Sequence, residues 1–325
     1  MKVISTFAGC GGSSTGYKMA GCEVVAMVEW DRHAVDCYAL NHPTTKLFHG
    51  DINKIKGADL LKATGLKPGE LDMLDGSPPC QGFSLAGQRV LDDPRNVLFQ
   101  QQIRLIRALK PKYVVIENVA GMIKGRMKRV AGEIFRAIQA EGYQVTAGLV
   151  KAIAFGVPQT RPRVFFVGAR DFKPRLPAPT HRIAVTAEQA LEKIKPVILE
   201  SDPPDLKVSA ETSPISRWIM DNIRHGENGA ALRERHGLSG THFGHFMLHP
   251  KRPCPTIIKS SGPQFYHWDR RMLACNEALV LCGFPANYKL LGIRAKQFQR
   301  IGNCVAPPVT AAIANTLRKQ ANRQK

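Results

Sequence analysis

Short apolar runs alternate with helical patterns along the first half of the chain, and this alternation predicts the fold class. The runs typical of buried strands lie at residues 3–6, 24–29, 47–50, 71–74 and 113–117, with further runs at residues 145–150 and 164–169. Strands that alternate with helices form βαβ units, in which successive strands are parallel. The pattern therefore predicts an α/β fold with a doubly wound, mostly parallel sheet.

Helical patterns lie between these runs. One covers about residues 14–20, where Ser13 is the expected N-cap and Gly21 the C-terminal stop, and another covers about residues 32–40. The clearest pattern starts at Pro94, because proline fits the first turn of a helix and an apolar face follows it.

The sequence changes character after about residue 171. Prolines punctuate the following stretch, which has little strand–helix rhythm, and a segment rich in His and Gly comes next. The last residues return to a helical pattern at 307–319. We therefore expect a sheet domain at residues 1–172, a smaller irregular domain at residues 173–298, and a return to the first domain at residues 299–325.

The chain is strongly basic. Lys and Arg number 46 against 26 Asp and Glu, which gives a formal net charge of +20. A well-solvated basic surface is one explanation, but a polyanionic partner is favoured because the surplus charge otherwise only repels itself. Charge alone does not separate DNA from RNA or an acidic membrane. No apolar stretch reaches the roughly 20 residues of a membrane span, and the eight scattered cysteines favour reduced thiols in a cytosol-like compartment.

A glycine-rich loop, FAGCGG, follows the first predicted strand. Gly9, Gly11 and Gly12 permit a tight turn and let the backbone approach a ligand closely. The spacing is not the G-x-G-x-x-G of dinucleotide-binding proteins, and a purely structural turn is about as good an explanation.

Acidic and aromatic residues end the next two predicted strands. Glu29 ends the second, where such folds bind ribose hydroxyls, and Trp30 follows it with a ring that can stack on a base. Asp51, after the third strand, can accept a hydrogen bond from an exocyclic amine. Together they indicate an adenosine-bearing cofactor that has no pyrophosphate.

One thiol stands in a stiff loop, SPPCQGFS. Cysteine is commonly a small buried apolar residue, but Cys80 follows the fourth strand, at the edge where open α/β sheets bind ligands. Pro78 and Pro79 stiffen its loop, and Gln81 and Ser84 give it polar neighbours. We interpret Cys80 as a functional thiol.

A carboxylate and two cations complete the candidate site. Glu117 follows an apolar run, where burial without a partner is costly, so a site residue is more probable than a structural one. Arg161 and Arg163 in QTRPR lie on one face if the segment is extended, either as a solvated edge or beside a thiol, where they favour the thiolate.

A zinc site is a further possibility. His242, His245, His249 and Cys254 lie close in sequence, but their spacing fits no standard ligand pattern. We expect no metal here.

The order of these motifs resembles that of the DNA (cytosine-5)-methyltransferases of the bacterial and phage modification type. FAGCGG resembles their cofactor loop, GSPPCQGFS their nucleophile loop, ENV their Glu-Asn-Val motif, QTRPR their Gln-x-Arg-x-Arg motif and QRIGNCVAPPV their closing Gly-Asn motif. RPCPTI, YHWDRRML and CGFP resemble the end of their variable region. The chain departs from the family pattern at Cys304, where many members have Ser, and at Ala274 and Cys282, which replace the usual Thr and Gln.

This resemblance implies a fold, a reaction and a set of partners. The fold is a Rossmann-like S-adenosylmethionine-dependent methyltransferase domain at 1–172, a target-recognition domain at 173–298 and a C-terminal return to the catalytic domain. The reaction is methyl transfer from S-adenosyl-L-methionine to C5 of cytosine in a specific duplex DNA sequence, through a covalent adduct with C6 of a flipped-out base. It further implies a monomer in the cytoplasm, associated with the nucleoid of a bacterial host, with no membrane partner and a possible restriction enzyme as functional counterpart.

The resemblance also assigns roles to residues. Cys80 attacks C6, Glu117 binds N3 and the 4-amino group, and Arg161 and Arg163 hold the base and backbone. The residues expected to bind the cofactor are Phe7, Ala8, Gly9, Gly11, Gly12, Glu29, Trp30, Asp51, Ile52, Pro78, Leu98, Asn303 and Val305. Those expected to bind nucleic acid are Gln81, Ser84 and Gln159.

Other functions stay open at this stage. An RNA-directed branch shares the catalytic motifs, so a tRNA cytosine-5 methyltransferase is the first alternative. A non-catalytic DNA-binding regulator is the second, although intact Cys80 and Glu117 argue against it. A nicotinamide oxidoreductase fits poorly because the glycine spacing is wrong and Cys80 would have no task.

Overall fold

A computed structural model describes the chain except for residues 80–97, 126, 209–212, 239–243, 261–263 and 325. It divides into two compact units. The first comprises residues 1–151, 162–179 and 305–325, and the second comprises residues 152–161 and 180–304. Relative to the expected domain boundaries, residues 152–161 and 299–304 fall in the second unit, and residues 173–179 fall in the first. Within that unit 159–160 pair with 254–255 in a small sheet, and 294–303 form a helix beside another of the same unit.

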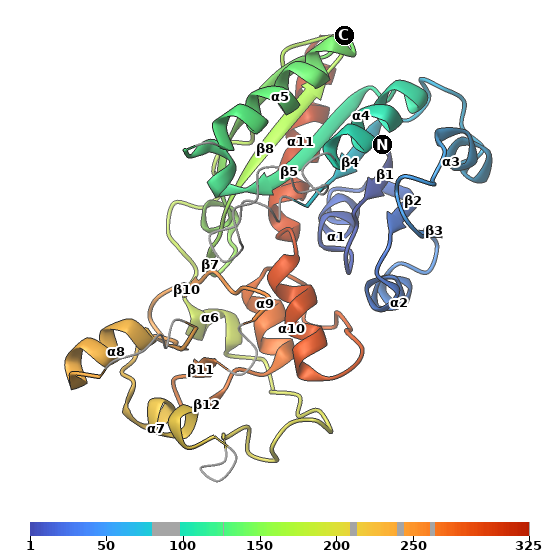
Figure 1. The fold of residues 1–325 in the computed structure, drawn as a ribbon. Coiled ribbons are helices and arrows are strands. Elements are labelled where there is room, and N and C mark those ends of the chain that lie inside the picture. Colours follow the sequence, from blue (N-terminus) through green and yellow to red (C-terminus); the bar gives the residue numbers. More distant parts are fainter. Residues whose placement is uncertain (80–97, 126, 209–212, 239–243, 261–263, 325) are drawn as a thin grey trace. The chain divides into compact units, whose positions relative to one another are not determined.

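The first unit is built on a seven-stranded sheet, counted over the described residues, with strand order β3-β2-β1-β4-β5-β8-β6 (Figure 1). The strands from β1 to β5 pair in parallel, and β8 is antiparallel to both β5 and β6. The mostly parallel, doubly wound sheet is confirmed. Its strands are β1 (Lys2–Thr6), β2 (Glu23–Glu29), β3 (Lys46–His49), β4 (Met73–Gly76), β5 (Tyr113–Val119), β6 (Gln144–Lys151) and β8 (Pro162–Ala169).

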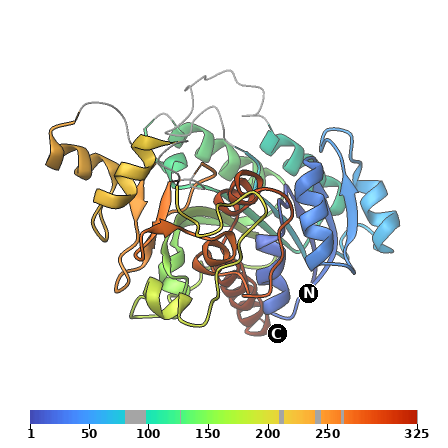
Figure 2. The ribbon, with the colours of Figure 1, turned by 90° about the horizontal axis from the view of Figure 1, so that it is seen from below.

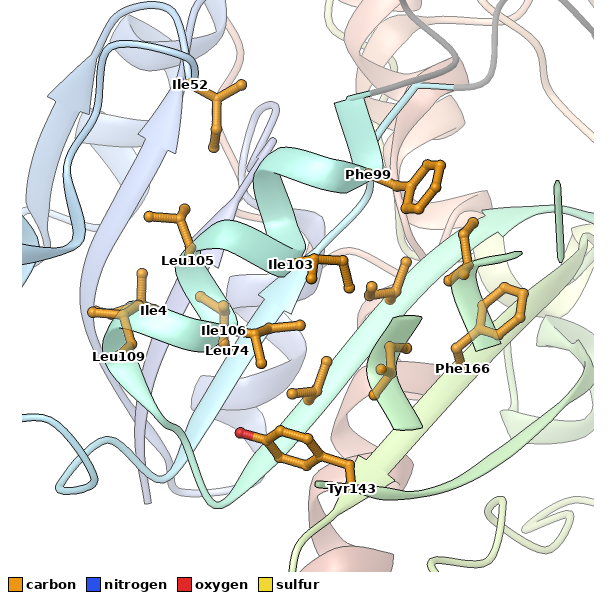
Figure 3. Packing of buried hydrophobic residues seen from close by; sticks show 14 of the residues in the cluster. Ile4, Ile52, Leu74, Phe99, Ile103, Leu105, Ile106, Leu109, Tyr143 and Phe166 are labelled. Carbon is orange, nitrogen blue, oxygen red and sulfur yellow. The ribbon is translucent and has the colours of Figure 1, made fainter. Parts of the chain in front are cut away.

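Helices cover this sheet because its central strands are apolar on both faces. Six of the seven residues of β5 are buried, as expected for a strand covered on two sides. On one face, Ile103 and Ile106 of α4 extend toward Leu74 of β4 (Figure 3). The helices of this unit are α1 (Gly12–Met19), α2 (Arg32–Asn41), α3 (Gly57–Thr64), α4 (Leu98–Leu109), α5 (Met127–Ala140) and α11 (Pro307–Asn322).

The last helix, α11, lies beside α1 (Figures 1 and 2). The contact is close because Gly16 faces it: a Cβ at Gly16 would lie 2.1 Å from the carbonyl oxygen of Pro307. Thr310 Oγ1 donates to the carbonyl of Ser13 at 3.1 Å. The C-terminal segment thus packs against the helix that follows the glycine loop.

Some predicted boundaries were wrong for identifiable reasons. Helix α1 begins at Gly12 and its N-cap is Gly11, with φ of 96°, so Ser13 lies inside the helix. The glycine loop reaches the helix through a left-handed residue, which removes the need for a side-chain cap. Strand β4 begins two residues later than predicted, at Met73. The predicted helix start at Pro94 lies outside the described residues.

The second unit contains more regular structure than its composition suggested. A three-stranded sheet, in the described part of the unit, has the order β12-β11-β9. Its core is closed by apolar residues from several helices and strands, namely Leu206, Ile219, Met220, Ile223, Leu232, Met247, Tyr266, Met272 and Ala274. The elements are β7 (Gln159–Thr160), α6 (Ala187–Leu191), α7 (Pro214–Asn222), α8 (Gly229–His236), β9 (Phe246–Met247), β10 (Cys254–Pro255), β11 (Phe265–His267), β12 (Arg271–Met272), α9 (Cys275–Leu281) and α10 (Arg294–Asn303).

Buried ion pairs hold the second unit together. Arg294 binds Asp202 through two hydrogen bonds of 2.7 and 3.0 Å. Arg271 binds Glu277 in the same bidentate way, at 2.8 and 2.7 Å. Among the described helices of both units, none is long and apolar enough to cross a membrane.

Candidate active site

The predicted site residues of the first unit gather at one edge of its sheet. Strands β1 to β5 run parallel, so their carboxyl ends and the loops that follow them lie on the same edge. Each of these loops carries a motif that the sequence singled out. Chain topology therefore brings the glycine loop, the acidic strand ends, the Pro-Pro segment and Glu117 to one edge.

The glycine loop has a strained backbone. Phe7, Gly9 and Gly11 adopt positive φ angles of 52°, 55° and 96°. For glycine this conformation costs little, whereas Phe7 must be held in it by its surroundings. A Cβ added at Gly9 would meet nothing within 4 Å, so this stretch of backbone faces open space.

Glu29 holds this loop in place. Its Oε2 accepts a hydrogen bond from the Gly9 amide at 2.8 Å, and its Oε1 accepts from the amides of Trp30 and Asp31 at 3.0 and 2.9 Å. A carboxylate has about four lone-pair sites, so these bonds leave capacity for a ligand hydroxyl. Next to it the Trp30 side chain is 77% exposed, which is unusual for such a large aromatic residue.

The loop after β3 presents Asp51 and Ile52. Asp51 Oδ1 accepts from the backbone and side-chain nitrogens of Asn53 at 2.9 and 2.8 Å. Arg104 of α4 donates to the carbonyls of Ile52 and Ile55 at 2.8 and 2.9 Å, and these two hydrogen bonds hold the loop against α4. No local pattern predicts this role of Arg104, because the loop that it binds lies some fifty residues away in sequence.

These residues fit the cofactor that the sequence implied. The edge offers a carboxylate beside an exposed indole, a second carboxylate and an open glycine backbone. This donor and acceptor set suits ribose hydroxyls, an adenine ring and its amine. Leu98 begins α4 and packs against the core of this unit, and Pro78 follows β4.

We expect Glu29→Gln to weaken the binding of S-adenosylmethionine by tenfold or more. The substitution removes a charged acceptor and leaves the Gly9 amide without a full partner, an effect of about 1.5–3 kcal/mol. Calorimetric titration of the cofactor-free protein measures it. Glu23→Gln is the matched control, since Glu23 lies exposed at the other end of β2. An unchanged affinity in Glu29→Gln would remove Glu29 from the cofactor site.

Asn118 holds the start of the Pro-Pro segment that precedes Cys80 in sequence. This side chain is buried, and its Nδ2 donates to the Pro78 carbonyl at 3.0 Å while its Oδ1 accepts from the Val119 amide at 2.9 Å. A small hollow beside Pro78 and Pro79 is lined by Phe99, Asn118 and Met122. Cys80, Gln81 and Ser84 lie outside the described residues.

Glu117 and Arg163 form an ion pair between adjacent strands. The Arg163 Nε lies 2.8 Å from Glu117 Oε1, and the side chains are only 16% and 9% exposed. In the antiparallel register of β5 and β8, Arg163 is opposite Val119, two residues beyond Glu117, so the two side chains are diagonal neighbours on one face. This arrangement orients the Glu117 carboxylate from one side.

Arg161 lies in different surroundings from Arg163. It belongs to the second unit and is 1% exposed. Its guanidinium donates to the carbonyl of Ile257 at 2.8 Å and to those of Gly302 and Cys304 at 2.6 and 2.8 Å. The two arginines therefore do not share one extended face, because β7 ends at Thr160 and β8 begins at Pro162 in a different sheet.

The remaining predicted residues lie around Arg161 or beyond it in the chain. Gln159 is fully buried, and its Nε2 donates to the Cys282 sulfur at 3.1 Å. Asn303 ends α10 with an exposed side chain, whereas Val305 is buried and begins the last segment of the first unit. The structure thus separates these residues between the two units.

A buried carboxyl that the sequence did not single out lies one residue before the end of β4. Asp75 Oδ2 accepts from Ser5 Oγ at 2.9 Å and Oδ1 accepts from the Tyr17 hydroxyl at 2.8 Å. Burial raises the pKa of Asp75 to about 7, Glu117 adds to the rise, and the hydroxyl donors, Ser13 among them, oppose it. The carboxyl therefore titrates in the neutral range.

This group gives protein stability a definite dependence on pH. The folded-state pKa of about 7 exceeds the ordinary value of 3.8, so its stabilising contribution is full below about pH 4 and is lost as the pH rises through about 7. About three pKa units correspond to about 4 kcal/mol. Asp75→Asn abolishes this titration. Urea denaturation should therefore show the variant gaining on the wild type between about pH 4 and pH 7, and a pH-independent difference contradicts the assignment.

Comparisons with known proteins agree with this geometry. A family model described as C-5 cytosine-specific DNA methylase matches residues 1–319. The type II methyltransferase M1.HphI of Haemophilus parahaemolyticus is 29% identical over 324 residues, covering 97% of this chain and 86% of that protein. The type II methyltransferase M.DdeI of Desulfomicrobium norvegicum is 30% identical over 374 residues, covering 98% and 88%.

A solved structure has the same fold over its whole length. A DNA modification methyltransferase encoded within a prophage of E. coli has a TM-score of 0.77 and 25% identity, with 99% of each chain covered. The motifs, the sheet and the family model all lead to one assignment. The chain belongs to the C-5 cytosine-specific DNA methylases, which transfer a methyl group from S-adenosylmethionine to C5 of cytosine in DNA.

Proposed function

We propose that this chain methylates cytosine within a specific duplex DNA sequence, by a covalent route in which Cys80 is the nucleophile. The observation that carries this proposal is the Glu117–Arg163 pair, beside a Pro78–Pro79 segment held by Asn118. A buried carboxylate with one side bound to arginine keeps its other side for a ligand. A carboxylate held in this way can bind a cytosine ring, and the loop that contains Cys80 then supplies the thiol that attacks the ring.

Cytosine C5 is a poor nucleophile because it belongs to an aromatic ring. Attack of the Cys80 thiolate on C6 forms the S–C6 bond, moves the ring electrons toward N3 and makes C5 an enamine carbon. N3 takes a proton from water as these electrons reach it, and the Glu117 carboxylate accepts hydrogen bonds from the protonated N3 and the 4-amino group, while Arg163 holds the carboxylate in position. S-adenosylmethionine supplies the methyl group when bound. Methyl transfer to C5 leaves S-adenosylhomocysteine, and water then takes the C5 proton, so that the C5=C6 double bond forms again, the C6–S bond breaks and the Cys80 thiolate is released.

The cofactor roles follow the edge of the sheet. Glu29 binds the ribose hydroxyls, and Trp30 stacks on the adenine. Asp51 binds the adenine amine, and Ile52 packs against the face of the adenine ring. The backbone at Gly9 provides an open surface for the cofactor. Phe7, Ala8, Gly12, Pro78, Leu98, Asn303 and Val305 complete the proposed set.

The contacts of Arg161 support a role in holding the chain in addition to the role that the family resemblance implies. Since its guanidinium binds three carbonyls, we propose that it holds the segment ending in Gly302 and Cys304, with Gln159 packed beside it. Gln81 and Ser84 remain proposed DNA-binding residues. The first unit would be catalytic and the second would recognise the target sequence.

The cellular setting is proposed on the same basis. We expect a monomer in the cytoplasm, associated with the nucleoid of a bacterial host, and paired in function with a restriction enzyme. The names of its type II relatives support the functional pairing with a restriction enzyme. The tRNA and regulator alternatives are not favoured, because the family model and these relatives are DNA methylating enzymes.

Bisulfite sequencing tests the function and finds the target. Unmethylated phage DNA, incubated with the purified protein and S-adenosylmethionine, should acquire protected cytosines within one short recurrent sequence. Transfer RNA in a parallel reaction should acquire none. Methylation of the tRNA but not of the DNA would reverse the assignment of substrate, and methylation of neither would support a non-catalytic role.

A further inference from the structure

A buried polar network connects the cofactor loop to the strand that leads to Cys80. We propose that Asp75, at the centre of this network, is a positioning residue for methyl transfer. It would set the cofactor loop in line with the nucleophile loop, so that the methyl donor faces C5 of the attacked base. The inference rests on the function proposed above and adds a residue to which neither the sequence motifs nor the reaction assigns a task.

The contacts of Asp75 span three elements at the ligand edge. Ser5 lies near the end of β1, Tyr17 and Ser13 lie in α1, and all three hydroxyls donate to the Asp75 carboxyl in β4. The glycine loop lies between Ser5 and Ser13 in sequence, so Asp75 binds both of its ends. Five residues after Asp75 comes Cys80.

A second set of contacts continues this network to the backbone. Thr6 Oγ1 donates to the Asp75 carbonyl at 3.0 Å and to Gln102 Oε1 of α4 at 2.5 Å. Gly76 packs closely against the Thr6 and Gln102 side chains, because a Cβ at Gly76 would lie 2.5 Å from Thr6 Oγ1 and 2.7 Å from the Gln102 amide. The end of β4 therefore has little freedom to shift against β1 or α4.

The ionised form of Asp75 has the more complete set of bonds. A carboxylate can accept hydrogen bonds from all three hydroxyl donors. A protonated carboxyl carries a hydrogen of its own, so one of the three hydroxyls must accept from it instead of donating. The titratable groups that face it are Tyr17 of α1 and Glu117 of β5, and its charge also acts on Tyr38 of α2. Its pKa lies near neutrality, so pH changes the network within the working range.

Alignment matters more for one half of the reaction than for the other. Attack by Cys80 on C6 depends on the nucleophile loop and the base. Methyl transfer also needs the donor carbon in line with C5, and a misplacement of about 1 Å can lower a rate about a hundredfold. A residue that sets the two loops relative to each other should therefore affect transfer and spare attack.

Two assays on the same DNA separate these steps. Phage DNA carrying tritium at C5 of cytosine releases it without cofactor when Cys80 attacks reversibly, because the enamine exchanges its C5 proton with water. Methyl transfer is measured with S-adenosylmethionine present. We expect Asp75→Asn to lower methyl transfer about tenfold or more, while exchange and the calorimetric affinity for S-adenosylmethionine change less than about threefold.

Asp72→Asn is the matched control. Asp72 lies just before the same strand, at its opposite end, where it accepts from the Lys2 amide and from Lys112 Nζ. This variant should transfer methyl groups like the wild type. Tyr17→Phe is the second test variant, because it removes one donor to Asp75 with little change of volume, and it should give a smaller loss of the same kind.

The ratio of transfer to exchange gives a readout that a merely structural role would not move. Thiolate formation affects both assays and cancels in the ratio. In the wild type the ratio should rise as the pH passes through about 7, and in Asp75→Asn it should stay flat. Equal loss of transfer and exchange, or no loss in either variant, overturns the inference. A wild type that methylates nothing would refute the proposed function, and the inference with it.

Discussion

DNA carrying 5-fluorocytosine at the target position is expected to trap the protein in a complex that survives a denaturing gel. If Cys80 attacks C6, release requires loss of the substituent at C5 as a cation. A proton can leave in this way and fluorine cannot, so the S–C6 bond has no exit once the methyl group has been transferred. Cys80→Ser should form no such complex, and its methyl transfer should fall by at least about a thousandfold.

The reason lies in the acidity of the two side chains. A thiol near neutral pH exists partly as the thiolate, which is the attacking species, whereas a serine hydroxyl is far less ionised. Cys275→Ser provides the control. Cys275 is a buried cysteine at the first position of α9, where serine is compatible with a helix start, and it should trap the DNA as the wild type does. A stable complex with Cys80→Ser would assign the nucleophile to another cysteine.

The sheet of the first unit was predictable because its signals are local. Each strand of the parallel core is a short apolar run, and each helix after it has its own caps or apolar face. The exact start of α1 was not predictable. Ser13 is a good N-cap residue, but the helix begins earlier, since Gly11 reaches a left-handed conformation that serine rarely adopts.

Pairing between side chains was harder to foresee than their presence. Glu117 and Arg163 were recognised separately, but their ion pair depends on the antiparallel register of β5 and β8. No pattern within either strand specifies that register. Arg161 shows the same limit, because alternation predicts a shared face only while one strand continues, and here the chain passes between two sheets.

Asp75 and Arg104 show what motif reading misses. Each acts through partners that are distant in sequence: Asp75 through Ser5 and Tyr17, and Arg104 through backbone carbonyls after β3. Asp75, like Glu117, is an acidic residue near the end of a buried strand. The same argument from the cost of burial could therefore have identified Asp75 from the sequence. Burial of the Asp75 carboxyl lowers the stability of the folded protein at neutral pH. Functional sites commonly reduce stability in this way.

Glu117→Gln is expected to lower methyl transfer by a hundredfold or more. The amide has nearly the same shape and can still accept from Arg163, but it no longer offers a negative charge to the base. Charge stabilisation of this kind is typically worth a factor of about 10²–10⁴ in rate. Single-turnover methylation of phage DNA measures the loss.

The pattern of the loss distinguishes Glu117 from a residue that only positions loops. Glu117 acts on the ring during the attack itself, so tritium exchange at C5 without cofactor should fall in proportion to methyl transfer. Cofactor affinity should stay within about threefold, because the contacts of Glu117 described here are with Arg163 rather than with the glycine loop. Glu141→Gln is the control, as Glu141 follows the last residue of α5 and pairs with Arg107 of α4. Preserved exchange with reduced transfer would move Glu117 from the attack step to the transfer step, and the proposed role would then be wrong.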